Sequence, residues 1–210
     1  MPSRKQEEAD MNVVAIFGSA HKGNSETLAE WCLEHLEEHG AHVSRYPLRA
    51  MHYKGCILCN GCKTGAETCM LRDDLTPALE AVHGADAVLV SSPVWFFDIP
   101  SQLKAFFDRW YSFFPPEYWR NNYASRLAKG KQAIMVLSQG QPEEFFQDLP
   151  VRYNAVFTLM GFMPMHVIRG CALRAPGAAA EQDGLKAQAR AVADRVLNGL
   201  PPERNLPSYW

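Results

Sequence analysis

The stretch NVVAIFGSAHKGNSETLAE, residues 12–30, decides the fold of this chain. It opens with a short apolar run that ends at Gly18, as a buried β-strand does. Asn24 or Ser25 can then cap a helix. The apolar positions of that helix recur every four residues, at Leu28, Cys32 and Leu36. A strand that passes through a short glycine-containing loop into a helix predicts the opening of a parallel α/β unit.

The same alternation of strand and helix continues through the rest of the chain. Further strands are predicted in residues 41–48, 85–92, 131–140 and 163–170. Helices are predicted in residues 73–84, 100–110, 142–160 with a break at Pro150, and 185–199. Strands joined by helices pair in parallel through right-handed crossovers. We therefore predict an α/β fold with a doubly wound, five-stranded parallel sheet in the order 2-1-3-4-5.

Length and composition place this sheet in a single globular domain. The chain has 210 residues, of which 47% are hydrophobic, and this is enough to bury one full-sized core. We predict that the domain covers residues 11–200. It follows a polar, aperiodic extension of residues 1–10, which we expect to be disordered. Residues 201–210 are predicted to form a C-terminal tail.

Charge and hydropathy argue against two classes of partner. The net charge of −2 offers no basic field for nucleic acid. The longest apolar runs are too short to span a membrane, and no apolar signal segment is recognised near the N-terminus. We therefore expect a cytoplasmic protein without a nucleic-acid or membrane partner.

The loop after the first predicted strand, GSAHKGNS in residues 18–25, differs at one position from the phosphate-binding loop of nucleoside triphosphatases. Asn24 stands where that motif needs a lysine, and the third strand ends without an acidic residue for Mg²⁺. The dinucleotide pattern G-x-G-x-x-G is missing as well. A phosphate monoester such as FMN needs only hydroxyls, amides and a helix N-terminus, with Gly23 keeping the backbone approachable. FMN therefore fits best, and a plain strand–helix turn is the alternative.

Two further loops belong to the same predicted edge. Ligands of a doubly wound sheet bind beyond the carboxyl ends of the strands, which selects residues 19–25, 93–98 and 138–141. The second of these loops can pack on a flat flavin ring, because three consecutive aromatic residues cannot all face inward. They are Trp95, Phe96 and Phe97. In the third loop, small and amide groups can meet the pyrimidine edge of the flavin at Ser138, Gln139 and Gly140.

Three segments together resemble the flavodoxin-like NAD(P)H-dependent FMN reductases, from residue 12 to about residue 200. They are GSAHKGNSETLAE, GCILCNGCKTGAETCMLRDDL and SSPVWFFDIPSQLKAFFDRWY. The resemblance implies a flavodoxin-like fold, bound FMN and a homodimer or homotetramer. It implies phosphate contacts at Ser19, His21, Lys22, Asn24 and Ser25. It also implies flavin-ring contacts at Pro93, Val94, Trp95 and Phe96.

Four of the six cysteines are crowded together with the spacing C-x2-C-x2-C-x6-C, at Cys56, Cys59, Cys62 and Cys69. Because nothing marks the chain as secreted, such a group indicates metal binding or redox chemistry rather than disulfides. Three thiolates at three-residue intervals, with a fourth to complete the set, favour a [4Fe–4S] cluster over zinc. The segment also resembles that of the iron–sulfur flavoproteins. Zinc and unligated thiols stay open as alternatives.

These features predict an FMN-dependent oxidoreductase. It would take electrons from NAD(P)H and pass them to a small-molecule or redox-protein acceptor. The flavin carries the reaction, so no catalytic side chain is predicted. A cluster, where present, would divide the electron pair into single electrons. Two other classes stay open, a non-enzymatic electron carrier and a phosphate-binding NTPase.

The aromatic segment FFPPEYWRNNY, residues 113–123, bears on association. Its rings would be costly on the surface of a monomer, so we expect at least a dimer. The segment could equally form a lid over the flavin or a loop packed on its own domain.

Overall fold

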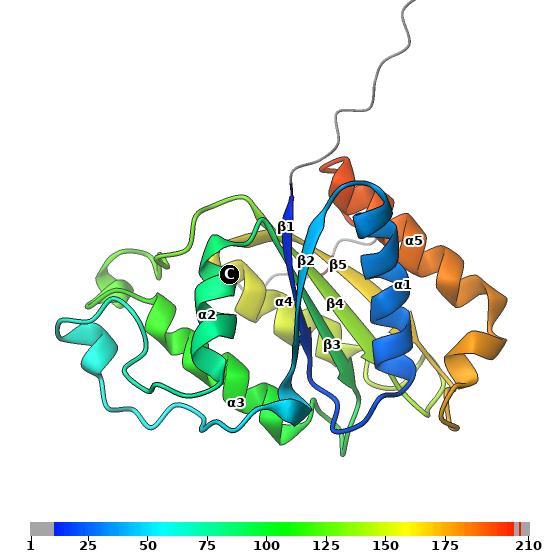
Figure 1. Cartoon of the computed structure of the whole chain (residues 1–210), viewed down its shortest axis with the longest axis horizontal. Helices are drawn as coiled ribbons and strands as arrows, with labels where there is room; N and C mark the ends of the chain where they lie inside the picture. Colours follow the sequence, from blue (N-terminus) through cyan, green and yellow to red (C-terminus); the bar gives the residue numbers. More distant parts are fainter. Residues whose placement is uncertain (1–10, 204–205, 207–210) are drawn as a thin grey trace, which may run out of the picture.

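The computed structural model describes residues 11–203 and 206 (Figure 1). Five strands form one parallel sheet in the order β2-β1-β3-β4-β5, which confirms the predicted topology. The strands are β1 (Asn12–Phe17), β2 (His42–Pro47), β3 (Ala87–Pro93), β4 (Lys131–Ser138) and β5 (Phe162–Gly170). The predicted N-terminal extension lies outside the described residues, as do residues 204–205 and 207–210 of the predicted tail.

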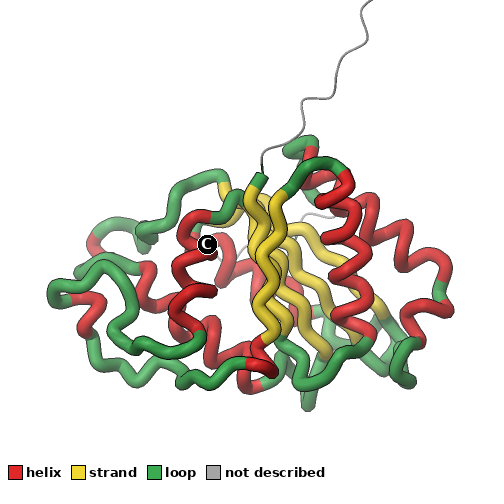
Figure 2. The backbone as a smooth tube through the Cα atoms, in the orientation of Figure 1, coloured by secondary structure: helices red, strands yellow, loops and turns green. Residues whose placement is uncertain are grey.

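Helices cover both faces of the sheet (Figures 1 and 2). One face carries α1 (Asn24–Glu38) and α5 (Asp183–Leu197). The other face carries α2 (Leu75–Gly84), α3 (Ser101–Arg109) and α4 (Asp148–Met160). Successive strand residues point to opposite faces, so β1 supplies both cores. Val14 and Ile16 join the core under α2, α3 and α4, whereas Val13, Ala15 and Phe17 join the core under α1 and α5.

The starts of α4 and α1 differ from the sequence prediction in ways that bear on capping. α4 begins at Asp148 instead of residue 142, and Pro150 lies in its first turn. Proline is tolerated there because the first N–H groups of a helix have no intrahelical acceptor, so Pro150 does not break the helix. α1 is capped by Gly23 instead of Asn24 or Ser25, and no side chain caps it.

The loops that follow β1, β3 and β4 leave the same edge of the sheet, because the strands are parallel. The segment between β2 and α2, residues 48–74, leaves this edge too. It runs outward from the sheet on the side of α2 and α3 and is drawn in cyan in Figure 1. We call residues 48–74 the cysteine segment, since it carries the four clustered cysteines. Its short 3₁₀ turns are Leu48–Ala50 and Gly61–Lys63.

The aromatic segment after α3 packs largely on its own domain. Phe113 and Phe114 are buried, and the ring of Tyr118 stacks on Phe114 with centroids 4.5 Å apart. Trp119 and Tyr123 are exposed. The expectation that this segment presents its rings to solvent is therefore wrong for Phe113 and Phe114. The 3₁₀ turn Trp110–Phe113 continues the buried face of α3, which is why these rings enter the core.

Further 3₁₀ turns span Tyr118–Arg120 and Ala178–Glu181. No helix among the described residues combines the length and the apolar character needed to cross a membrane.

Candidate functional site

The loop between β1 and α1 starts in a crowded part of the core. Gly18 donates its N–H to the carbonyl of Ser91 on β3 at 2.8 Å. A Cβ at residue 18 would lie 2.6 Å from Cδ2 and 2.9 Å from Cβ of Leu103 on α3, so glycine is needed for this close approach. The next residues reach the surface, with Ser19 half-buried and His21 and Lys22 exposed. The loop thus leaves the core at Gly18 and opens at the ligand edge of the sheet.

The N-terminus of α1 is open to an anion. Gly23 is its N-cap with extended backbone, and a Cβ there would meet nothing within 4 Å. The first N–H groups of a helix have no intrahelical acceptor, and together with the helix dipole they attract negative charge. Ser25 is buried, and its carbonyl accepts the hydroxyl of Ser91 at 2.9 Å. The helix start is therefore fixed against β3 while its backbone donors stay uncapped by side chains.

The side chain of Asn24 has a framework role. Its Nδ2–H donates to the carbonyl of Ala175 at 2.8 Å, and its Oδ1 accepts the N–H of Ala179 at 3.1 Å. Both ends of the amide are used, which ties the start of α1 to the segment after β5. Because the side chain is occupied, Asn24 can contact a phosphate through its backbone N–H.

The loop after β3 forms a tight hairpin. Trp95 and Asp98 exchange two backbone hydrogen bonds of 2.7 and 3.0 Å. Phe96 and Phe97 between them have φ values of 43° and 69°, as in a type I′ turn. The side chains of Trp95, Phe96 and Phe97 are exposed by 71%, 89% and 72%. The prediction that aromatic rings of this loop lie at the surface is confirmed.

Asp98 anchors the hairpin to α4. Its carboxylate accepts the hydroxyl of Tyr153 at 2.9 Å and pairs with Arg152 at 2.7 Å. Burial, and then the hydrogen bond to Asp98, raise the pKa of Tyr153, so the phenol stays neutral and keeps donating. The exposed rings are thus carried on a turn that is fixed at its base.

The loop after β4 adjoins the hairpin, since Val94 donates its N–H to the carbonyl of Ser138 at 2.7 Å. Gln139 is buried, and its Oε1 accepts a hydrogen bond from Arg169 at 2.8 Å. Its Nε2 donates to the carbonyls of Gln141, Pro142 and Phe145. Gln139 therefore shapes the loop from within. Half-buried Gly140 is the most accessible of the three predicted contacts in this loop.

The four predicted cysteine ligands line one small cavity. Its volume is about 10 Å³, and Cys56, Cys59, Cys62 and Cys69 all contribute to its wall. Such a space holds about one water molecule. Within residues 11–203 and 206, no three His, Cys, Asp or Glu side chains converge closely enough to hold a metal ion. The fold thus gathers the four cysteines around one cavity without bringing their sulfurs to ligand distance.

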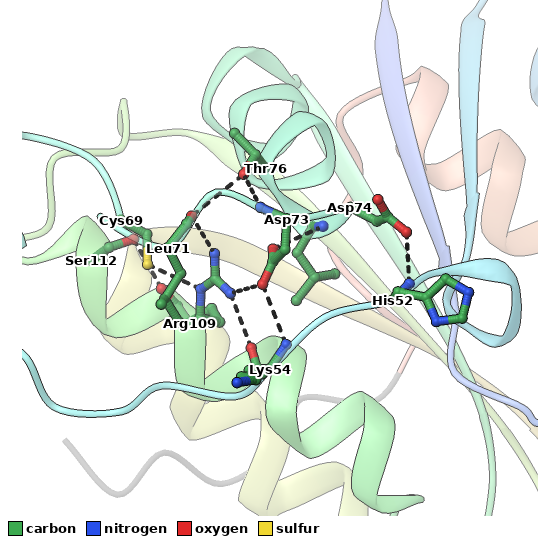
Figure 3. Close-up of polar contacts among 10 residues, drawn as sticks. His52, Lys54, Cys69, Leu71, Asp73, Asp74, Thr76, Arg109 and Ser112 are labelled. Carbon is green, nitrogen blue, oxygen red and sulfur yellow. Dashed lines mark hydrogen bonds and ion pairs between the residues drawn. The ribbon is translucent and has the colours of Figure 1, made fainter.

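A buried arginine joins this cavity to α3 (Figure 3). The Nε–H of Arg109 donates to Sγ of Cys69 at 3.0 Å, and its Nη1 pairs with Asp73 at 2.8 Å. The same guanidinium donates to the carbonyls of Lys54 and Leu71, each at 3.0 Å. Burial works to lower the pKa of Arg109, but Asp73 and Cys69 outweigh it, so this pKa is raised. Burial works to raise the pKa of Asp73, but Arg109 and the Lys54 and Leu75 N–H groups outweigh it, so this pKa is lowered.

Two more cations face the cavity region. Nζ of Lys63 donates to Sγ of Cys62 at 3.3 Å and to the carbonyls of Tyr111 and Phe114 at 2.6 and 2.8 Å. Arg126 donates to the carbonyl of Cys62 at 3.2 Å. Burial lowers the pKa of Lys63, while the contact with Cys62 opposes this. In the part of the chain that the structure describes, neither Lys63 nor Arg126 pairs with a carboxylate, so Cys62 lies beside two cations whose charge is not balanced by an ion pair.

A sequence model of the NADPH-dependent FMN reductase family matches residues 11–174. The chain belongs to this family. The matched range includes all three ligand-edge loops and the cysteine segment. The chain is thus an NAD(P)H-dependent, FMN reductase-like oxidoreductase, as the resemblance predicted.

Two curated relatives of this family member carry the name iron-sulfur flavoprotein. One, from Archaeoglobus fulgidus, is 28% identical over 178 residues, which cover 84% of this chain and 76% of that protein. Another, from Methanosarcina thermophila, is 32% identical over 100 residues. That match spans about half of each chain, 47% of this one and 52% of the relative.

Solved structures share the fold of this FMN reductase family member. An NAD(P)H:quinone oxidoreductase from Methanothermobacter marburgensis superimposes with a TM-score of 0.62 at 21% identity, covering 91% of this chain and 97% of the other. An FMN-dependent NADH-azoreductase from Bacillus anthracis, solved in complex with FMN, gives 0.66 at 17% identity, covering 89% and 100%. At these identities the likeness shows the flavodoxin-like fold alone.

The residues fit the cofactor of the family. FMN has a phosphate and a flat aromatic ring. The uncapped helix start at Gly23 offers the donors that a phosphate needs, and the hairpin Trp95–Asp98 offers exposed rings at the same edge of the sheet.

Sequence reasoning misses Arg109, Lys63 and Asp73 as parts of the site. The available signal for Arg109 is its position between Phe107 and Trp110, three residues after Phe106. A cation in this run of buried aromatic residues must have an internal partner. For Lys63 the signal is its place directly after Cys62. Neither pattern tells which sulfur or carboxylate the cation meets.

Proposed function

We propose that this FMN reductase family member passes electrons from NAD(P)H, through a [4Fe–4S] cluster on Cys56, Cys59, Cys62 and Cys69, to a small-molecule or redox-protein acceptor. One observation carries the proposal. In a chain of this family, four cysteines line a single cavity, with Arg109 and Lys63 donating to two of their sulfurs, in a segment that leaves the ligand edge of the sheet. The names of the curated relatives support the cluster.

The proposed FMN site draws on three loops. Phosphate contacts are assigned to Ser19, His21, Lys22, Gly23, Asn24 and Ser25. Ring contacts are assigned to Pro93, Val94, Trp95 and Phe96, and contacts with the pyrimidine edge to Ser138, Gln139 and Gly140. Backbone N–H groups at the start of α1 would take the phosphate oxygens, and exposed Lys22 would add positive charge. Gln139 would act indirectly, by holding its loop in shape.

The donor set and the charge of the cysteine cavity support the cluster. Four thiolates are the usual ligands of [4Fe–4S], and with them the cluster is an anion. Lys63 and Arg126, which pair with no carboxylate among the described residues, would balance that charge. The four sulfurs would have to rearrange to bind a cluster, since the volume of the cavity between them is about 10 Å³.

When bound, FMN supplies the hydride and electron chemistry of the reaction. The residues of the chain bind and orient it. The exposed rings of the hairpin would shield the flavin from water, and Asp98 would hold these rings in place through Tyr153 and Arg152. No protein acid or base is assigned, because hydride transfer to a flavin does not require one.

We also propose a cytoplasmic homodimer or homotetramer. Exposed aromatic side chains support association, since such surface is costly in water. They are Trp95, Phe96, Phe97, Trp119 and Tyr123. Sedimentation of the FMN-loaded protein at micromolar concentration would test this, and a 23.6 kDa species would contradict it.

Anaerobic purification with iron available tests the central proposal. We expect flavin absorption with an added broad iron–sulfur band, about four irons per chain, and bleaching of the flavin by NADH or NADPH. Cys59→Ser should lose the iron and keep the flavin. Flavin bleaching without iron would leave an FMN reductase that has no cluster. Loaded protein that neither nucleotide bleaches would favour a non-enzymatic electron carrier.

A further inference from the structure

The guanidinium of Arg109 donates most of its N–H groups to the cysteine segment (Figure 3). Of the five N–H groups of an arginine, four donate here to atoms of residues 54–73. The Arg109 side chain is fully buried. A charge in that place is tolerated only when its contacts offset the loss of water. The partners of Arg109 in the cysteine segment are therefore required by the fold.

Among the four predicted ligands, Cys69 is the one whose position is least restricted by the spacing of the cysteines. The other three follow at three-residue intervals, whereas six residues separate Cys69 from Cys62, among them Gly65 with a positive φ of 156°. Contacts with Arg109 fix the position of Cys69 instead. Arg109 contacts the Cys69 sulfur directly and holds Leu71 and Asp73, two and four residues further on.

We infer that Arg109 is the positioning residue for Cys69 and that its hydrogen bond to this sulfur raises the reduction potential of the cluster. The inference rests on the proposed function, because it concerns the cluster proposed there. A cluster with four thiolates is an anion that gains one more negative charge on reduction. Arg109 donates to the Cys69 sulfur at 3.0 Å in the present structure, and a cation that keeps this contact when Cys69 is a ligand stabilises the reduced form more than the oxidised form.

Asp73 opposes Arg109 in this effect. Its carboxylate lies 2.8 Å from Nη1 of Arg109 and offsets part of the positive charge that the sulfur experiences. Removing the charge of Asp73 should therefore shift the potential upward, and removing the charge of Arg109 should shift it downward. A role limited to holding the loop together predicts no such opposition.

The test is an anaerobic redox titration of the iron-loaded, full-length protein, followed by the spin signal of the reduced cluster. Arg109→Gln should lower the equilibrium constant for one-electron reduction at least tenfold, which is about 59 mV in midpoint potential. Asp73→Asn removes the charge but keeps one side-chain oxygen, which can still accept from Lys54 and Arg109, while the N–H of Leu75 loses its side-chain acceptor. It should raise the potential. Arg109→Lys keeps the charge and should lower the potential less than Arg109→Gln does.

Opposite shifts for Arg109→Gln and Asp73→Asn support the inference. Shifts in the same direction, or a loss of iron with an unchanged potential in the remaining clusters, overturn it. If Arg109→Gln does not fold, Asp73→Asn decides, and an unchanged or lower potential overturns the inference. Wild-type protein that takes up no iron refutes the proposed cluster and this inference with it. Iron-loaded wild type with unshifted variants refutes the inference alone.

Discussion

Asn24 donates its side-chain N–H to the carbonyl of Ala175 at 2.8 Å, across 151 positions of the sequence. The N–H of Ala179 donates back to Oδ1 of Asn24 and closes the contact. The helix start to which we assign the FMN phosphate is thus fixed by the segment after β5. Because no side chain caps this helix, the contact of Asn24 with Ala175 and Ala179 fixes its first turn instead.

Replacing Asn24 with Ala should reduce stability more than FMN binding. The change leaves the Ala175 carbonyl and the Ala179 N–H without this partner, which should cost about 1–3 kcal/mol in denaturant unfolding. The backbone N–H of residue 24 remains, so FMN affinity in a fluorescence titration should fall little. Asn24→Asp keeps the acceptor for Ala179 but sets a carboxylate oxygen against the Ala175 carbonyl, so it should not restore the stability lost in Asn24→Ala. A variant of normal stability with strongly weakened FMN binding would place the Asn24 amide on the phosphate instead.

Gly23→Asp should separate folding from phosphate binding. The position has extended backbone and open space around its Cβ, and Asp is a favoured N-cap. Stability should therefore hold or rise by about 0.3 kcal/mol. The new carboxylate would take the N–H groups of α1 and repel the phosphate, so FMN affinity should fall at least about tenfold. Gly23→Ala is the matched control and should bind FMN nearly as the wild type does. Unchanged affinity in Gly23→Asp would refute the phosphate assignment.

Phe97→Gly should weaken association and leave stability nearly unchanged, because the relief of backbone strain is offset by the loss of the edge contact between the rings of Phe97 and Phe146, whose centroids lie 5.7 Å apart. Phe97 has a φ of 69°, where a residue with a Cβ is disfavoured by about 1 kcal/mol, and glycine removes this strain. The substitution also deletes a ring that is 72% exposed. Thermal unfolding at low protein concentration and sedimentation would measure the two effects. Phe97→Leu, which keeps an apolar side chain and the strain, is the control. Unchanged sedimentation of Phe97→Gly would show that this ring takes no part in association.

His166 should make the fold sensitive to mild acid. It is buried on β5 beside a cavity, neither ring nitrogen has a hydrogen-bond partner among the described residues, and its pKa is lowered from 6.5 to about 4 by burial and then by Arg195. Between these pH values the unfolded chain binds a proton that the folded chain refuses. Stability is therefore fully present above pH 6.5 and falls as the pH drops toward 4.

Denaturant unfolding of wild type and His166→Leu at about pH 7 and about pH 5 measures this contribution. As the pH is lowered from about 7 to about 5, the free energy of unfolding of the wild type should fall relative to that of His166→Leu by about 1 kcal/mol per pH unit. The carboxylates of the chain titrate in both proteins, so the comparison isolates the contribution of His166. A difference that does not change with pH would show that His166 takes up its proton in the folded state.

The fold follows from patterns that are local in the sequence. The five apolar runs and the helical spacing of Leu28, Cys32 and Leu36 sufficed for the strand order, since parallel α/β folds allow few alternatives. The exposed rings after β3 followed from the same reasoning. The start of α4 did not, because the turns of residues 142–147 have helical composition but settle around the buried amide of Gln139.

The parts of the site that the sequence does not reveal are long-range hydrogen bonds and ion pairs. Arg109 meets Cys69 and Asp73 across 40 and 36 positions, and Asn24 meets Ala175 across 151. No local periodicity encodes such a pair, because each partner would look ordinary without the other. Burial of a charge shows that a partner exists, but the tertiary fold decides which one.

The burial of Arg109 by the cysteine segment also bears on how such proteins can diverge. Trimming residues 48–74 to an ordinary strand–helix connection of about 2–6 residues would leave the guanidinium without its partners. A buried charge that loses its partner costs about 3–5 kcal/mol, a large share of the stability of a domain. An apolar residue at position 109 would remove that penalty. Conversion between a descendant that has the cysteine segment and one that lacks it would thus pass through two linked mutations, a deletion beside β2 and a single codon change in α3.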